Sequence, residues 1–128
     1  MATMANVGLE VLATRAIADT PAAFTAGALT ETAITEAAGD TALAGEIAGA
    51  DGLKRSAMTC TNPSAYVTRW THVWTATTTK NVQGFAIFNA ATAPVSGIML
   101  MEHLFPVVKG VILNETLTVT AQMTTAAA

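Results

Sequence analysis

Hydrophobic and polar residues alternate with a period of two through much of the second half of the chain. Between residues 65 and 77, one set of alternate positions carries Tyr66, Trp70 and Trp74, and the other set carries Val, Arg and Thr. Alternation in a segment so rich in β-branched and aromatic residues is typical of a strand with one buried face. The polar segment TTTKN predicts a turn after it, and a second strand is expected from 82 to 88, at the distance of a hairpin.

The same pattern predicts further strands toward the end of the chain. One is expected from 98 to 105, where Pro106 ends or bends it because proline cannot donate a ladder hydrogen bond. Another is expected from 115 to 123, where Leu, Val and Ala alternate with Thr and Gln. Gly84 is a candidate position for a β-bulge, and Asn114 suits a turn position with positive φ. Several short strands joined by turns predict a mainly β fold, either an antiparallel β-sandwich or a jelly-roll-like domain.

A different pattern marks the segment from 29 to 48, which is rich in residues that favour helices. Gly39 and Asp40 interrupt it, so two short helices are predicted rather than one long helix. The second helix would place Leu43 and Ile47, four residues apart, on one face. Both side chains are expected to pack against the sheet.

The chain before this segment has no clean period. The stretch TPAAFTAGA, with its Pro, Gly and small residues, is typical of an extended connector. We therefore expect an N-terminal arm or edge element at 1–28, a β-sandwich domain with short helices at its start at 29–123, and a flexible tail at 124–128. The arm is expected to pack on a neighbouring subunit, and the alternative is an N-terminal strand that completes its own sandwich. The assembly contacts predicted in this arm are Val7, Leu9, Val11, Leu12 and Phe24.

Charged residues are scarce and make up 12% of the sequence. A soluble domain usually carries about 25%, so the surface is expected either to expose apolar and hydroxyl groups or to cover them with another subunit. A homo-oligomer is therefore predicted. The net charge of −3 and the lack of a Lys/Arg cluster exclude a strongly basic nucleic-acid-binding protein. The sequence shows no run of 18 apolar residues and no export signal, so we expect no membrane partner and synthesis in a cytoplasm.

The sequence contains no motif for catalysis or cofactor binding. It has no Gly-rich phosphate loop, nucleophile elbow, HExxH or CxxC. Glu102, His103 and His72 are the best candidates for a metal site, but adjacent strand residues point to opposite faces, so Glu102 and His103 would not share one metal. The single cysteine, Cys60, is expected to be buried and structural. We therefore predict that the protein is not an enzyme and has no catalytic, cofactor-binding or metal-binding residues.

The aromatic row admits two interpretations. Tyr66, Trp70 and Trp74 would belong to the core, where each large ring buries much surface. Alternatively, they would lie exposed and stack on a sugar or a base. The spacing on one strand face favours the core, and the sequence leaves both interpretations open.

Four stretches follow one another between residues 40 and 123. They are DTALAGEI followed by the basic Arg55, then WTHVWTAT, then VQGFAIFNAAT, and last IMLMEHLFPVV followed by NETLTVTAQM. In this order they resemble the small structural proteins of tailed-phage virions, a family that includes decoration and tail-fibre-like proteins.

This resemblance implies a structural protein that is made in the host cytoplasm and located in the virion of a tailed phage. It would decorate or cement the capsid or tail through subunit contacts. Its expected partners are itself, as a homo-oligomer, and other virion proteins such as the major capsid protein, without nucleic acid or membrane. The alternative is a glycan- or receptor-binding module of a phage fibre or spike.

Overall fold

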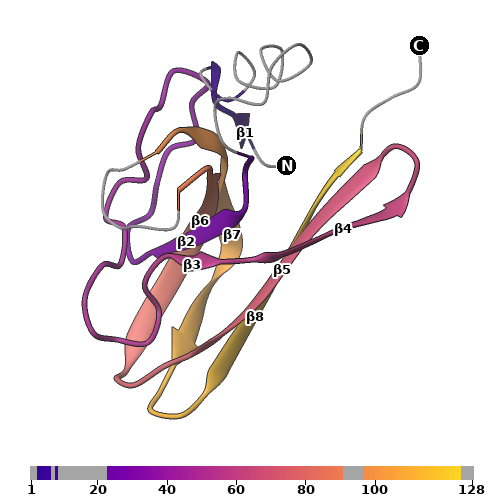
Figure 1. Ribbon diagram of the computed structural model, residues 1–128. Coiled ribbons are helices and arrows are strands. Elements are labelled where there is room, and N and C mark those ends of the chain that lie inside the picture. Colours follow the sequence, from indigo (N-terminus) through magenta and orange to yellow (C-terminus); the bar gives the residue numbers. More distant parts are fainter. Residues whose placement is uncertain (1–2, 7, 9–22, 91–96, 125–128) are drawn as a thin grey trace.

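The computed structural model of the protein describes residues 3–6, 8, 23–90 and 97–124. The described strands form two antiparallel sheets that pack as a β-sandwich (Figure 1). Helix is essentially absent from these residues. The mainly β fold predicted from the alternation of polar and apolar residues is therefore confirmed.

The larger sheet holds five strands. In their order across the sheet they are β1 (Thr3–Met4), β7 (Met99–Val111), β6 (Lys80–Phe88), β2 (Ala26–Thr30) and β3 (Ser56–Ala57). β6 lies in the middle and pairs with β7 on one side and β2 on the other. All five residues of β2 are buried, as expected for a strand between two neighbours with both faces covered.

The smaller sheet holds three strands. In order they are β4 (Thr59–Ser64), β5 (Val67–Thr75) and β8 (Thr116–Thr124). β5 pairs with β8 along its whole length without a shift in register. In Figure 1 the hairpin of β4 and β5 extends away from the larger sheet. The observed bounds of β5 and β8 differ from the predicted ranges only at terminal residues.

The sequence predicts a hairpin of β5 and β6, and this is wrong because the two strands lie in different sheets. After β5, the Ala76 N–H donates to the Glu115 carbonyl and the Asn114 N–H donates to the Ala76 carbonyl, at 2.9 and 2.8 Å. The Thr77 N–H then donates to the Asp51 carbonyl at 2.9 Å. These bonds carry the chain past the end of the smaller sheet, so the next strand joins the larger one.

β7 carries a large bulge at Pro106. Between Val82 and Gly84, two steps along β6 are matched by five steps along β7, from 104 to 109. Pro106 lies in this extra chain, where its missing N–H costs no ladder hydrogen bond. A Cβ on Gly84 would lie 2.6 Å from the carbonyl oxygen of His103, so only glycine fits there. The bulge predicted at Gly84 is confirmed, and Pro106 bends the strand rather than ending it.

Trp70 and Trp74 lie in the core and are only 3% and 2% exposed. The indole N–H of Trp70 donates to the Phe24 carbonyl at 2.8 Å, and that of Trp74 donates to the Lys54 carbonyl at 2.9 Å. Because each N–H has an acceptor, both rings are buried without an unpaired polar group. The interpretation of these two residues as core is confirmed. Further fully buried apolar side chains are Leu29, Leu53, Val82, Ile87, Phe88, Met99 and Leu100.

The two short helices predicted between 29 and 48 are wrong. The segment begins inside β2, and residues 31–55, which we call the covering loop, consist of turns, bends and irregular chain without a helix. Gly45 has a φ of 66°, which a right-handed helix does not allow. Helix propensity is a weak preference, and the pairing of β2 with β6 outweighs it. Leu43 and Ile47 are nevertheless buried, as predicted.

A buried ion pair holds the covering loop in place. Arg55 donates to both carboxylate oxygens of Glu46, at 2.9 Å from Nε and 2.6 Å from Nη2, and neither side chain is more than 5% exposed. Nη1 of Arg55 donates to the Ala90 carbonyl at 3.1 Å. The guanidinium carbon also lies 3.6 Å from the ring centre of Phe88. A buried ion pair is stable when its geometry is bidentate and its other donors are bonded, as they are here.

Removing one member of this pair should destabilise the fold strongly. Glu46→Ala leaves the Arg55 charge buried without its carboxylate, and we expect a loss of about 3–5 kcal/mol in the free energy of unfolding, measured with urea. The double variant E46L/R55M removes both charges and should recover much of that loss. Glu31→Ala, which breaks an exposed pair with Lys80, is the control. An equal loss in E46A and E31A would contradict the role of the buried pair.

Candidate assembly surfaces

Four large apolar side chains lie exposed along the last part of β7 and in the turn between β7 and β8. Val107 and Val108 belong to the bulge of β7, and Ile112 and Leu113 lie at its end and in the turn. Their exposed fractions range from 50% to 63%. We call these four residues the apolar end. Grouped exposed apolar side chains mark contacts with other molecules, whereas isolated ones do not.

The turn itself explains why two of these side chains face solvent. Asn114 has a φ of 69°, which confirms its predicted turn position. The Ile112 N–H donates to the Glu115 carboxylate and the Glu115 N–H donates to the Ile112 carbonyl, both at 3.0 Å. These bonds close a tight turn whose tip carries Ile112 and Leu113, so their side chains project outward.

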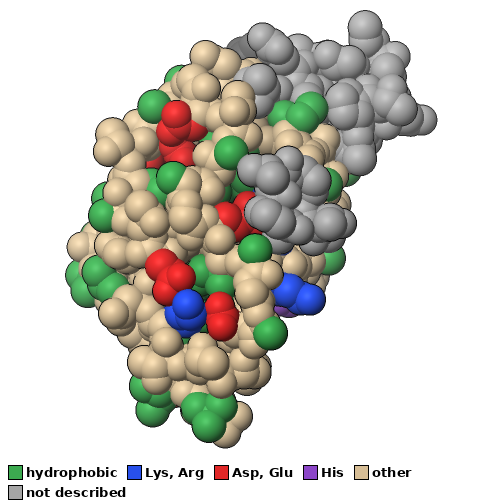
Figure 2. Space-filling model, turned by 90° about the vertical axis from the view of Figure 1, so that its left-hand side faces the viewer, with side chains coloured by type: hydrophobic (Ala, Val, Ile, Leu, Met, Phe, Trp, Pro, Cys, Tyr) green, Lys and Arg blue, Asp and Glu red, His purple; other side chains and the backbone are tan. Residues whose placement is uncertain are grey.

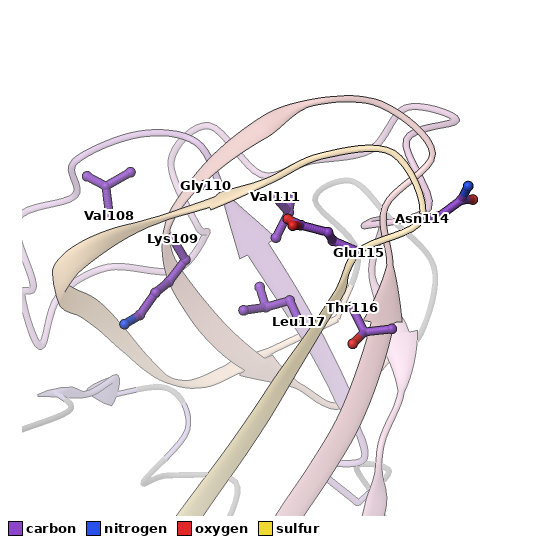
Figure 3. A pocket seen from close by; sticks show the side chains of 8 residues that line it. All are labelled: Val108, Lys109, Gly110, Val111, Asn114, Glu115, Thr116 and Leu117. Carbon is purple, nitrogen blue, oxygen red and sulfur yellow. The ribbon is translucent and has the colours of Figure 1, made fainter.

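An open hollow of about 720 Å³ lies beside the apolar end, between β7 and β8. Figure 3 shows the side chains of Leu117 and Lys109 extending into the space between the two strands, while Asn114 points away from it. Leu117 is half-buried, so part of its apolar surface is available to a partner. The hollow therefore extends the apolar end rather than forming an enclosed small-molecule pocket.

A second view shows hydrophobic side chains at the end of the molecule where the turns after β5 and β7 lie (Figure 2). Figure 2 shows them at the lower end, where Figure 1 places the turns after β5 and β7. Red and blue side chains lie above this end in the same view, whereas the lower end itself shows none (Figure 2). On this face the lower end is therefore apolar rather than charged.

Threonine covers the outer face of the smaller sheet. Residues that lie opposite each other on paired strands share a face, and the register places Thr59, Thr71 and Thr120 in one row. The one charged member of this surface, Arg69, donates to the side-chain oxygen of Gln122 at 3.0 Å. We call this surface the threonine face. Its members are Thr59, Thr61, Val67, Arg69, Thr71, Val73, Thr75, Thr116, Thr118, Thr120, Gln122 and Thr124.

The assembly contacts predicted from the sequence are not the residues of these surfaces. Val7, Leu9, Val11 and Leu12 lie outside the described residues. Phe24 is 7% exposed and packs in the core of its own chain. The prediction that Phe24 is an assembly contact is therefore wrong, because the segment around it enters the larger sheet.

The described parts of the segment 1–28 belong to the domain of their own chain. Thr3–Met4 forms an edge strand on β7, and the Ala5 N–H donates to the Leu100 carbonyl at 2.8 Å. The end of the segment enters β2 at Ala26. These residues match the edge-element alternative, and residues 1–2, 7 and 9–22 lie outside the described part of the chain.

The apolar end was not predicted, although the sequence carries a signal for it. The run VVKGVIL has apolar residues at consecutive positions on both sides of Lys109 and Gly110. A strand with one buried face covers only alternate positions, so a run of this kind leaves apolar side chains exposed. Consecutive apolar residues near a turn were therefore a usable indication of a contact surface.

Tyr66 and Cys60 both lie exposed in or near the hairpin of β4 and β5. Since the two tryptophans are buried, the stacking interpretation now concerns Tyr66 alone. The prediction of a buried Cys60 is wrong, because β4 is an edge strand with exposed residues throughout. Partial desolvation still raises the pKa of the Cys60 thiol, which favours the protonated, weakly nucleophilic form.

Glu36 anchors the covering loop to β7. It accepts hydrogen bonds from the Thr3 hydroxyl at 2.8 Å and the Leu104 N–H at 3.0 Å, and its Oε2 lies 3.5 Å from Nδ1 of His103. Burial acts to raise the pKa of Glu36, but these hydrogen bonds and the nearby histidine lower it overall. Glu36 therefore serves as a charged anchor of the loop.

Glu102 is a second, more deeply buried carboxyl beside the same loop. It accepts a hydrogen bond from the Ala37 N–H at 3.1 Å and shares a side-chain hydrogen bond with Asp40. Burial raises the pKa of Glu102 to about 7, with further contributions from Asp40 and from the charge of Glu36. A protonated Glu102 therefore fits this position better than a charged one.

No comparison with known proteins gives this chain a family. Protein-family models, curated proteins and solved structures all yielded no match. In the part of the chain that the structure describes, His72, Glu102 and His103 do not form a metal site, since no group of three or more His, Cys, Asp or Glu could hold a metal ion there. Among the same residues, no helix is long and apolar enough to cross a membrane.

Glu102 should make the stability of the fold depend on pH. Its pKa is about 7 in the folded chain against an ordinary value of 4.5, so its contribution is complete below pH 4.5 and is lost as the pH rises through 7. This difference corresponds to on the order of 3 kcal/mol. Urea denaturation should show stability falling from pH 5 to pH 8, and Glu102→Gln should flatten this change. An equal pH dependence in E102Q would contradict the assignment.

Proposed function

We propose that this protein is a structural virion component of a tailed phage, which docks onto copies of itself and onto other virion proteins such as the major capsid protein. The observation that carries the proposal is the apolar end, whose four large apolar side chains are each half or more exposed. Association that covers such surface gains roughly 25 cal/mol per Å² of apolar area before the entropy of binding is subtracted. The resemblance in motif order to decoration and tail-fibre-like proteins supports the choice of particle.

The threonine face supports the same function. It is a broad surface on one side of the smaller sheet with a single charged side chain, Arg69. A threonine hydroxyl can donate or accept a hydrogen bond, and its methyl group adds apolar contact. Such a face can pack against a protein lattice without burying charges, which would be costly.

Charge placed on the apolar end should weaken association. The double variant I112D/L113D puts two carboxylates at the tip of the turn, where both side chains are exposed in the single chain. We therefore expect an unchanged melting temperature and a loss of self-association and of incorporation into particles. Sedimentation at several concentrations and co-purification with virions measure the two effects.

The matched control adds the same charge elsewhere. S64D/A65D changes two exposed residues, Ser64 at the end of β4 and Ala65 in the turn that follows it, and it should associate like the unmodified chain. If the two double variants associate equally well, the apolar end is not a contact. If the unmodified chain stays monomeric at every concentration and does not bind the particle, the proposed function is wrong.

A second candidate is a glycan- or receptor-binding module, and the observation that favours it is the exposed ring of Tyr66. Since Trp70 and Trp74 are buried, tryptophan emission should be blue-shifted relative to the unfolded chain and should not change when saccharides are added. Glycan binding that is lost in Tyr66→Ala would favour this candidate. A saccharide-dependent shift in tryptophan emission would contradict the placement of both indoles in the core.

A further inference from the structure

The smaller sheet ends at β8, whose outer edge has no paired strand among the residues that the structure describes. An unpaired edge presents a row of backbone N–H and C=O groups that can pair with another strand. The open hollow between β7 and β8 is lined in part by Thr116 and Leu117. The beginning of this edge is therefore accessible.

Other edges of the sandwich carry features that hinder strand pairing, and β8 does not. β4, the opposite edge of the same sheet, contains Pro63 and an irregular register between Thr61 and Ser64. The edges of the larger sheet, β1 and β3, have only two residues each, and β7, which β1 covers only at Met101 and Glu102, contains Pro106 within its bulge. β8 has the sequence TLTVTAQMT, without Pro, Gly or charge, and pairs with β5 without a bulge. Since proline, charge and bulges are the means by which proteins protect their edges, β8 is the unprotected one.

Hydrogen bonding beyond the end of β5 shows which backbone groups of β8 face outward. Ala76 and Glu115 continue the register of the two strands, and the Ala76 N–H donates to the Glu115 carbonyl at 2.9 Å. Bonded positions alternate along an antiparallel pair, so the odd-numbered residues of β8 bond to β5. The residues whose backbone groups point to the free edge are Thr116, Thr118, Thr120, Gln122 and Thr124.

We infer that β8 pairs with β8 of a second copy of this chain, antiparallel and about a two-fold axis at Thr120. The inference rests on the proposed function, because it names a second copy as the partner and adds β8 to the apolar end as a surface through which copies associate. This register is the one that pairs all the residues of β8, and it places Thr120 opposite Thr120 of the second copy. Since the Thr120 backbone points outward, each Thr120 N–H donates to the carbonyl of the other copy.

The side chains that meet in this register are compatible. On the inner face, Leu117 lies opposite Met123 of the second copy, and Val119 lies opposite its Ala121. Leu117 and Met123 are both half-buried in the single chain, so pairing covers apolar surface that the monomer leaves exposed. On the outer face, Thr meets Thr or Gln, and cross-strand Thr pairs are favourable. β8 contains no charged side chain, so no like charges are opposed.

Pairing through β8 also changes the shape of the threonine face. The two smaller sheets join into one sheet in which both β4 strands form the outer edges. The threonine faces of the two copies then lie on the same side of that sheet and become continuous. A dimer therefore presents a wider neutral surface to a particle than a monomer does.

A disulfide cross-link tests the register in the full chain. Thr120→Cys in a Cys60→Ser background leaves a single thiol, which is oxidised with diamide. Hydrogen-bonded partners have Cα atoms about 5.5 Å apart, which is within disulfide range, so most T120C chains should become covalent dimers.

The matched control is Thr116→Cys in the same background. It lies on the same strand and face, but its two copies would be roughly 26 Å apart, so it should stay monomeric. A mixture of T116C and Thr124→Cys should cross-link, because these positions are opposite in the inferred register. Equal cross-linking of T116C and T120C alone, or none in T120C, would overturn the inference.

A second pair of variants tests the backbone hydrogen bonds. Thr120→Pro removes the outward N–H but no bond to β5, whereas Thr120→Val keeps that N–H. Loss of the two symmetric hydrogen bonds should weaken self-association of T120P about tenfold relative to T120V, as measured by sedimentation. Circular dichroism checks that T120P is folded, and the cross-linking result decides if it is not. Equal association of the two folded variants would overturn the pairing.

These results separate the inference from the proposed function. A chain that self-associates in sedimentation but does not cross-link through T120C overturns the pairing of β8 alone. A chain that stays monomeric at every concentration and does not bind virions overturns both.

Discussion

The buried ion pair of Arg55 and Glu46 fixes the position of the covering loop, and much of the sandwich is built against that loop. The loop has almost no regular hydrogen bonding of its own, so side chains must hold it. Directly before Arg55, Leu53 is fully buried and the Lys54 carbonyl accepts the indole N–H of Trp74. Directly after it, β3 pairs with β2. Displacing the pair would therefore disturb the tryptophan core and the edge of the larger sheet together.

The strands could be predicted from the sequence because alternation with a period of two indicates which side chains are buried within the folded chain. β5 and β8 show this best. The loop could not be predicted, because an Ala-rich segment has helix propensity whatever its neighbours are. What decides against a helix is long-range: Leu29 and Thr30 pair with Phe85 and Gly84 of β6, and the Ile47 N–H donates to the Leu29 carbonyl at 2.8 Å, contacts that no local pattern records. Arg55 and Glu46 are likewise partners without any periodic relation in the sequence.

The candidate contact surfaces were harder to predict than the strands. Alternation indicates which residues are buried within the chain, but it does not distinguish an exposed residue from one that a partner covers. Phe24 was expected at a contact because its surroundings lack a period, yet it packs in the core. The exposure of Val107 and Val108 follows from the size of the bulge at Pro106, and that size depends on the close approach of Gly84 on β6. The pairing of two distant segments thus exposes two of the four side chains of the apolar end, and the turn after β7 exposes the other two.

Because charged residues are scarce, the edge strands of this sandwich have a strong influence on association between copies of the chain. Net charge of one sign keeps copies of a protein apart, and with 12% charged residues that repulsion is weak on most faces. Side chains such as threonine select partners poorly, because their hydroxyl groups both donate and accept. Backbone geometry is more selective: Pro63 interrupts β4, and β1 and β3 have two residues each, whereas β8 is a long edge strand without such an interruption. In a chain of this composition, the distribution of proline and bulges among the edge strands therefore directs association more than the pattern of surface charge does.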